Sequence, residues 1–114
     1  MTIWRTLKAA TSPARSILIE QGTLSFYRAN GALTLIEIDD LVSAEIRVLQ
    51  GDIYWLLIDK NDNMALIADD NPDIGQVRRY LSQWRGFNYD GLLRFDKDHQ
   101  SSLQLWPIAQ TKVA

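Results

Sequence analysis

Residues 22–68 read GTLSFYRANGALTLIEIDDLVSAEIRVLQGDIYWLLIDKNDNMALIA, and this stretch decides the fold. Short apolar runs recur in it roughly every ten residues, and turn-forming residues such as Asn30-Gly31 and Gln50-Gly51 separate them. Asn-Gly tolerates the positive φ that a tight hairpin turn requires. Connections this short join antiparallel neighbours and leave no room for crossover helices. The stretch therefore predicts an antiparallel meander and excludes a doubly wound parallel sheet.

The alternation of apolar residues predicts which side chains of these strands share a face. In 32–38 the alternating residues are Leu33 and Leu35, with Ile36 beside them and Ile38 following. The run 53–59 is almost wholly apolar, which predicts a central strand covered on both faces. In 41–49 one face is expected to carry Val42, Ala44, Ile46 and Val48.

An amphipathic helix is expected directly after the meander. The segment 69–73, DDNPD, is typical of a helix start, because Asx residues cap helices and acidic groups are favoured at the positive end. Gly86 is expected to end the helix. Apolar residues recur in between at steps of three and four; they are Ile74, Val77, Tyr80, Leu81 and Trp84.

The remaining elements are shorter. We expect a strand at 15–20, a short second helix that contains Leu92, Leu93 and Phe95 and is capped by Asn88 or Asp90, and a last strand or a docked tail at 103–107. Around Ile3, Trp4 and Leu7, a short helix and a packed arm are equally compatible with the sequence. The fold class is α+β. It is an antiparallel meander sheet or partly open barrel of about six to seven strands, capped by a C-terminal helix and a short second helix, in a single domain over 1–114.

Composition and charge narrow the possible functions. The chain has no cysteine, which excludes disulfides, thiol nucleophiles and thiolate metal sites. It has neither a signal-peptide pattern nor a run of about 20 apolar residues, so we expect a cytoplasmic protein that is not tied to a membrane. Residues 37–73 carry ten acidic and two basic side chains, which disfavours nucleic-acid binding. Acidic residues suit the turns of an antiparallel sheet, and a basic partner docking on them is the open alternative.

Three groups of polar residues resemble metal or catalytic sites. Asp59, Asn61, Asn63 and Asp70 match part of a calcium loop, but Met64 stands where that loop needs glycine, so a polar hairpin turn is favoured. The single histidine, His99, shares one expected loop with Asp96, Asp98 and Ser101. A catalytic triad is assembled across a rigid scaffold, so a solvated loop is favoured there. For the third group, a strand-end turn is favoured over an acid–base pair; it consists of Glu37, Asp39 and Asp40. We expect no enzyme, metal or cofactor.

A meander of about six strands followed by an amphipathic helix resembles the pleckstrin-homology-like superfold. The resemblance rests on residues 22–68 and on NPDIGQVRRYLSQWRGF at 71–87. The sequence is also similar to small bacterial proteins of that kind, in which the helix ends in a Gly-Phe-Asp/Asn-Tyr segment, here 86–89, and a Leu-Trp pair follows, here 105–106. The resemblance implies this fold over 15–86, with an extension over 86–107.

The resemblance does not carry over the family's lipid site. Phosphoinositide binding in the family uses basic residues around the first hairpin. That turn is Gln21-Gly22 in this chain, with Glu20 before it, and Arg15 and Arg28 are the basic residues nearby. Phosphoinositide binding is therefore not expected.

Aromatic and arginine residues gather around the end of the expected helix and allow two interpretations. The favoured one is that the rings cover the open end of the sheet; they are Trp55, Trp84, Phe87, Tyr89 and Trp106. In the other, some of them form an exposed binding surface with arginines, since both residue types are enriched at interaction hot spots. The candidate partner-binding residues are Arg78, Arg79, Trp84, Arg85 and Tyr89.

The expected function is a non-enzymatic module that binds a protein partner or its own copy, by burying side chains at the sheet rim or by strand addition at an edge. One alternative is a binder of a small molecule or lipid headgroup that uses Arg15 or Arg28. Another is an immunity-type inhibitor of a partner protein, which the acidic middle of the chain would suit. An enzyme would require a concave site that gathers Glu37, Asp39 or His99.

Overall fold

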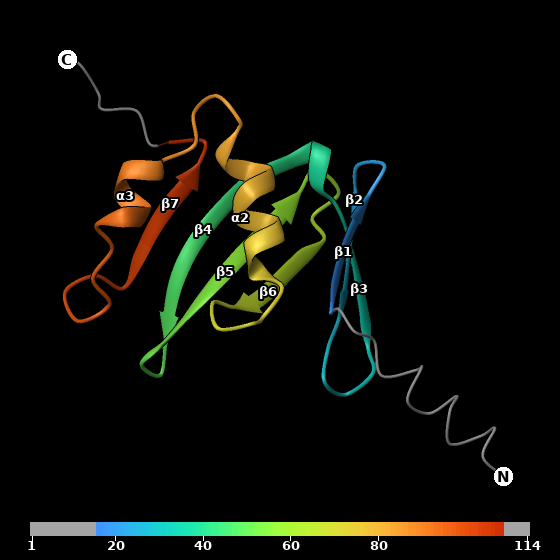
Figure 1. Cartoon of the computed structure of the whole chain (residues 1–114), viewed down its shortest axis with the longest axis horizontal. Coiled ribbons are helices and arrows are strands. Elements are labelled where there is room, and N and C mark those ends of the chain that lie inside the picture. Colours follow the sequence, from blue (N-terminus) through green and yellow to red (C-terminus); the bar gives the residue numbers. More distant parts are fainter. Residues whose placement is uncertain (1–15, 109–114) are drawn as a thin grey trace, which may run out of the picture.

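The computed structural model describes residues 16–108, which form two antiparallel sheets and two helices (Figure 1). Sheet A has the strand order β1-β2-β3, and sheet B has the order β6-β5-β4-β7. The elements are β1 (Ile17–Glu20), β2 (Thr23–Tyr27), β3 (Leu33–Glu37), the 3₁₀ turn η1 (Ile38–Asp40), β4 (Leu41–Leu49), β5 (Asp52–Asp59), β6 (Met64–Ala68), α2 (Ile74–Ser82), α3 (Tyr89–Leu93) and β7 (Ser102–Trp106). The predicted α+β fold is confirmed, and the two sheets do not close into a barrel. The helix or arm expected around Trp4 lies outside the described residues.

Two-residue hairpin turns join strands in both sheets, as the sequence predicts. Gln21 and Gly22 have φ values of 51° and 80°, and Gln50 and Gly51 have values of 52° and 85°. Positive φ at both central positions is the combination whose twist matches that of the flanking strands. An ideal Cβ at Gly22 would lie 2.7 Å from a carboxylate oxygen of Asp39, so a larger residue would have to displace that side chain in addition to adopting the positive φ.

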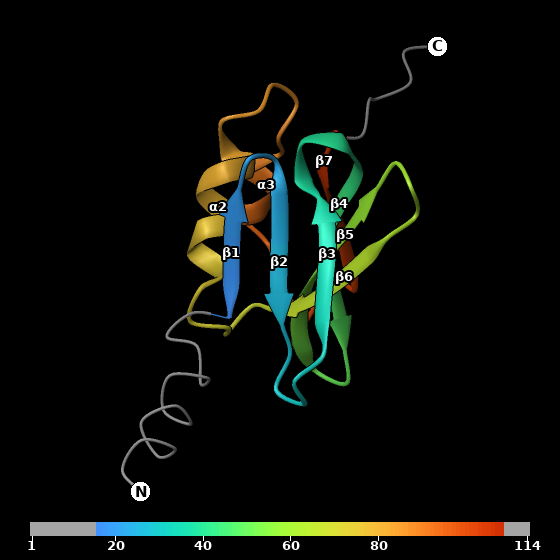
Figure 2. The same cartoon turned by 90° about the vertical axis from the view of Figure 1, so that its right-hand side faces the viewer.

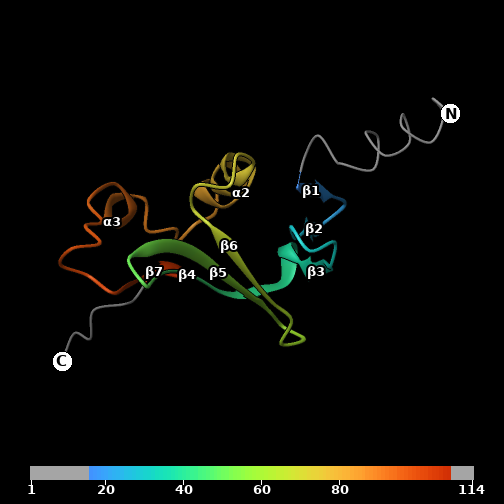
Figure 3. The same ribbon diagram turned by 90° about the horizontal axis from the view of Figure 1, so that it is seen from below.

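One hydrophobic core joins α2 to both sheets. Trp55 and Leu57 of β5 and Val77 and Leu81 of α2 are fully buried. Figure 3 shows that α2 and α3 cover the same face of sheet B, while sheet A stands beside that sheet. Burial of each such side chain stabilises the fold by roughly 1.5–3 kcal/mol, so these four residues contribute strongly to the stability of the fold.

Within residues 16–108, no helix lies on the other face of sheet B. Along β5 the side chains alternate between the two faces, so that Leu56 points away from the helices. It is 8% exposed, because neighbouring side chains of the same face surround it. The prediction that this strand is covered on both faces is therefore right in the sense of burial, although helices cover one face alone.

The expected alternation in β3 is reversed. Leu33 and Leu35 are 48% and 51% exposed, whereas Ile36 is fully buried. Ile36 lies opposite Leu24 of β2, and this buried cross-strand pair determines which face of β3 points to the core. The strand therefore turns its two leucines outward.

The start of β4 also differs from expectation. Val42 is 52% exposed, whereas Leu41 is buried. The β4–β5 register shifts between Leu41 and Ser43, so that β4 holds one extra residue at this point. Beyond this bulge the predicted inward positions Ala44 and Ile46 are buried.

A buried carboxylate connects the two sheets. Asp59 at the end of β5 is fully buried, and its Oδ2 accepts a hydrogen bond from the backbone N–H of Glu37 in β3 at 3.0 Å. Its Oδ1 accepts from the backbone N–H groups of Asn61 and Asn63, each at 2.9 Å, and Asn63 Nδ2 donates to Oδ2 at 3.0 Å. Burial alone raises the pKa of Asp59, but these bonds outweigh it and hold the pKa below its usual value. The segment 60–63 is therefore a polar turn organised by Asp59.

The segment before α2 holds the edge of sheet A. The backbone N–H of Ser16 donates to Asp73 Oδ2 at 2.5 Å, and the Ser16 hydroxyl donates to Asn71 Oδ1 at 3.0 Å. Gln76 Nε2 donates to the carbonyl of Ile17 in β1 at 3.1 Å. Figure 2 shows β1 alongside α2. These bonds fix sheet A against the helix that covers sheet B.

Candidate functional site

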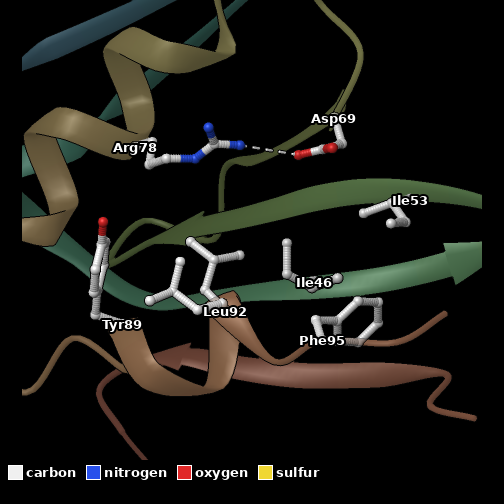
Figure 4. Close-up of a pocket in the computed structure, with 8 residues that line it drawn as sticks. Ile46, Ile53, Asp69, Arg78, Tyr89, Leu92 and Phe95 are labelled. Carbon is white, nitrogen blue, oxygen red and sulfur yellow. Dashed lines mark hydrogen bonds and ion pairs between the residues drawn. The ribbon is translucent and has the colours of Figure 1, made fainter.

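A pocket of about 340 Å³ lies between α3, α2 and the strands β4 and β5 (Figure 4). We call it the α3 pocket. Most of its lining is apolar or aromatic, and its volume is at the lower end of the range of ligand pockets. The lining residues are Ile46, Ile53, Asp69, Arg78, Tyr89, Leu92, Leu93 and Phe95.

The helix α3 is one short turn held in place by its cap. Asn88 Oδ1 accepts a hydrogen bond from the backbone N–H of Gly91 at 3.0 Å, and the backbone N–H of Asn88 donates to the carbonyl of Leu105 in β7 at 2.7 Å. The predicted cap at Asn88 is thus confirmed. The helix contains no buried residue, and on the pocket rim Leu93 is 68% exposed and Tyr89 is 50% exposed. Side chains four residues apart lie on one side of a helix, so these two form a single apolar edge.

Arg78 reaches from α2 across the polar side of the pocket. Its Nη2 donates to Asp69 Oδ1 at 3.4 Å, and its guanidinium carbon lies 5.7 Å from the ring centroid of Trp55. Trp55 Nε1 donates to the same oxygen of Asp69 at 2.9 Å. Figure 4 shows the Arg78 side chain running from α2 towards Asp69. The buried Nε of Arg78 has no acceptor among the described residues.

The five predicted partner-binding residues do not form one cluster. Arg78 and Tyr89 line the α3 pocket. Arg79 instead lines a shallow depression with Tyr80 and Gln83, together with Ile19 of β1. The structure therefore brings two of the five together, and a binding role for any of them stays a prediction.

The other two predicted residues belong to the turn after α2. Trp84 packs against Trp106, with ring centroids 4.9 Å apart and the rings in an edge-to-face arrangement. Trp106 Nε1 donates to the backbone carbonyl of Arg85 at 3.0 Å, while the Arg85 residue is exposed. Gly86 has a φ of 91° and reverses the chain, so that Phe87 packs on the core. The expectation that these rings pack as a cover holds for Trp84 and Phe87, which lie against the core, whereas Tyr89 stands at the pocket rim.

Several pocket residues were not among the predicted site residues. Ile46 and Ile53 follow the strand alternation and were expected in the core. Asp69 was expected at the helix start, and its pairing with Arg78 arises because the end of β6 passes beside α2. Leu92 and Leu93 were expected in a short apolar helix, but nothing in the sequence indicated that they would line a pocket.

The groups considered for catalysis are dispersed. The His99 side chain is 81% exposed, and its Nδ1 lies 2.7 Å from a carboxylate oxygen of Asp96 in the connection between α3 and β7. Asp39 accepts a hydrogen bond from the Tyr80 hydroxyl at 2.5 Å, and Glu37 accepts one from the Thr23 hydroxyl at 3.4 Å. Figure 1 shows the α3–β7 connection on the side of sheet B that is away from sheet A, whereas the turn from β3 to β4, which contains η1, lies where the two sheets meet. None of Glu37, Asp39 and His99 lines any of the four pockets described within residues 16–108.

The hydroxyl of Tyr80 has a perturbed pKa. The hydrogen bond to Asp39 raises the pKa of Tyr80, and burial and the negative charge of Asp39 act in the same direction. This bond joins α2 to η1 and so belongs to the fold rather than to the α3 pocket.

Most acidic side chains in the middle of the chain have partners inside the protein. Seven of the ten between residues 37 and 73 accept a hydrogen bond or form an ion pair; they are Glu37, Asp39, Asp40, Glu45, Asp59, Asp69 and Asp73. This pattern favours the interpretation of these acids as turn and corner residues over that of an acidic docking face.

Neither metal sites nor membrane spans emerge from the part of the chain that the structure describes. No three histidine or acidic residues there are grouped to hold a metal ion, and none of the helices there has the length and apolar character needed to cross a bilayer. We found no match to the chain among protein-family models, curated proteins or solved structures. The pleckstrin-homology-like resemblance therefore stays a prediction.

Proposed function

We propose that this protein is a non-enzymatic binding module that holds an apolar side chain of another protein chain in the α3 pocket. The observation that carries the proposal is an apolar pocket with two large exposed side chains, Tyr89 and Leu93, on one edge. Interaction hot spots combine such anchors with arginine around a pocket that loses its water on binding. Arg78 lies on the opposite side of the same pocket, and its side chain is 43% exposed, so the exposed part of the guanidinium offers hydrogen-bond donors to a partner's backbone or side chains.

Side-chain burial is favoured over strand addition at β1, β3 and β7, because parts of these three sheet edges already hold hydrogen bonds from other elements. An added strand would have to displace these bonds before it could pair. The groups in use are the carbonyl of Ile17 in β1, the backbone N–H of Glu37 in β3 and the carbonyl of Leu105 in β7. The rim of the α3 pocket needs no such displacement.

Site-specific photo-crosslinking in the native host tests this proposal. The photoreactive residue p-benzoylphenylalanine replaces Leu93 at the pocket rim, and a matched protein carries it at Leu33, which is exposed on sheet A. We expect a light-dependent crosslinked species from position 93 that is absent from position 33. Mass spectrometry of that species identifies the partner, and a species of twice the chain mass identifies a second copy.

Arginine variants then connect the crosslink to the pocket. In the protein with the photoreactive residue at position 93, Arg78→Met is expected to reduce the crosslinked species, because it removes the donors beside the anchor. Arg79→Met is the matched control, since this neighbouring arginine lies outside the pocket. No crosslink from position 93, or equal crosslinking from positions 93 and 33, would count against the proposal.

A further inference from the structure

A second concavity lies on the helix-free side of sheet B, between that sheet and sheet A. Its volume is about 470 Å³, larger than that of the α3 pocket, and the two share no residue. We call it the inter-sheet groove. Its lining residues are Phe26, Arg28 and Thr34 from the β2–β3 side and Arg47, Leu49, Leu56, Met64 and Leu66 from sheet B.

The groove floor is apolar and open. Leu49, Met64 and Leu66 are 41%, 57% and 43% exposed. Leu66 lies opposite Leu56 in the β5–β6 register, and Met64 points to the same face two residues before it. These side chains form one continuous apolar surface, and neither α2 nor α3 of the described residues 16–108 lies over it. An apolar guest would remove this surface from water.

The polar groups of the groove are hydrogen-bond donors or neutral hydroxyls, and none of its lining residues is acidic. Arg28 has no acidic partner among the described residues. Arg47 donates from Nε to Glu45 at 2.6 Å, which leaves its Nη groups free for a guest. Thr34 adds a hydroxyl. In a chain of net charge −2, this groove is therefore a locally cationic site beside an apolar floor.

We infer that the inter-sheet groove binds a free single-chain anionic amphiphile, a molecule with an apolar tail and one carboxylate or phosphate head. The tail lies on Leu56, Met64 and Leu66. The head takes hydrogen bonds from Arg28, whose planar guanidinium suits two oxygens of one anionic group. A free molecule fits better than a bilayer, because the tail must enter a concavity between two sheets, whereas a bilayer presents its headgroups as a flat surface.

A methionine label gives a direct readout. The chain contains two methionines, Met1 and Met64, so protein labelled with ¹³C in its methionine methyl groups gives one signal from the groove. The probe is decanoate below its micelle-forming concentration, and decyltrimethylammonium has the same tail with the opposite charge. We expect decanoate to shift the Met64 signal saturably, and we expect decyltrimethylammonium to bind about tenfold more weakly, because its head meets guanidinium groups instead of an anion partner.

Two variants separate the head contact from the tail contact. Arg28→Gln is expected to weaken decanoate binding about tenfold, whereas Arg79→Gln, outside the groove, leaves it unchanged. Leu66→Gln changes a half-exposed side chain of the groove floor and is expected to abolish the decanoate-induced shift of the Met64 signal.

Three results would overturn the inference. One is a loss of charge selectivity, seen either as equal affinity for the two probes or as decanoate affinity that survives Arg28→Gln. Another is sedimentation of the protein with phosphatidylglycerol vesicles while decanoate leaves the Met64 signal unmoved, which would assign the groove to a membrane surface. The third is a Met64 shift that depends on protein concentration without any probe, which would assign it to a second copy of the chain.

Discussion

On one face of sheet B, Trp55 and Leu57 are fully buried beneath the helices, whereas on the other face Met64 and Leu66 are 57% and 43% exposed. The same strands build both faces, because side chains alternate along them. Both faces carry large apolar side chains, so the presence of apolar residues alone does not decide which face is closed. The helix α2 decides which face is closed, because its apolar side chains pack on one face of sheet B. The closed face therefore holds the fold together, and the open face remains available for a guest.

The largest expected effect contrasts one leucine from each face. Leu81→Ala removes a fully buried side chain of α2 and is expected to lower the free energy of unfolding by about 2–5 kcal/mol through lost contacts and a cavity. Leu66→Ala on the open face is expected to lower it by less than about 1 kcal/mol. Urea unfolding followed by tryptophan fluorescence measures both. Equal losses would show that the open face is closed in solution.

A smaller effect is expected where the sheets meet. Asp59→Asn removes a buried charged acceptor that binds Glu37 across the sheets, and we expect a loss of about 1–3 kcal/mol at pH 7. Because the folded pKa of Asp59 is lowered, its contribution is fully present above the usual pKa of 3.8 and is lost as the pH falls through the folded value. Urea unfolding between pH 7 and pH 2 should therefore show a shallower acid dependence in the variant. Asp62→Asn, exposed in the same turn, is the matched control and should leave the wild-type profile intact.

The contact between α2 and η1 is weaker still. Tyr80→Phe breaks the hydrogen bond to Asp39 and is expected to lower the free energy of unfolding by less than about 1 kcal/mol. Since the folded pKa of Tyr80 is raised, its stabilisation is present below pH 10 and is lost as the pH rises through the folded value. Alkaline titration by ultraviolet absorbance should lose its highest step in this variant and keep it in Tyr27→Phe. A highest step that survives in Tyr80→Phe would contradict the assignment.

The smallest expected change in stability is at the rim of the α3 pocket. Leu93→Ser should change the free energy of unfolding by no more than about 0.5 kcal/mol, because the side chain is 68% exposed. It should nevertheless reduce crosslinking from a photoreactive residue placed at Tyr89. Thermal melting and the crosslink yield measure the two properties separately. Leu33→Ser is the control, with an equally small effect on stability and an unchanged yield.

The order and type of the elements follow from local signals in the sequence, because two-residue turns and a helix start are defined by a few adjacent residues. The faces of two strands could not be predicted in the same way. At Leu35-Ile36 and at Leu41-Val42, two apolar residues stand side by side and either could point inward. The pairing of Ile36 with Leu24 decides the first case and a bulge decides the second, and both depend on partner strands.

Only those residues of the candidate site that lie close together in the sequence could be predicted. Arg78 and Tyr89 could be named from the pattern around the end of the helix. The rest of the α3 pocket could not, because the fold brings Ile46 and Ile53 beneath a helix that begins more than 30 residues later. The side chains of Arg78 and Arg79 line different depressions because neighbouring residues of a helix point in different directions.

The bonds that hold β1 against the start of α2 join residues 57 and 59 positions apart in the chain. During synthesis, each hairpin of sheet A can form as it leaves the ribosome, because its contacts are local. Its inner side, with Ile17 and Leu24, nevertheless stays uncovered until residue 76 has emerged. A ribosome that stalls before α2 would therefore release a fragment with exposed apolar surface, which is the kind of intermediate that chaperones recognise.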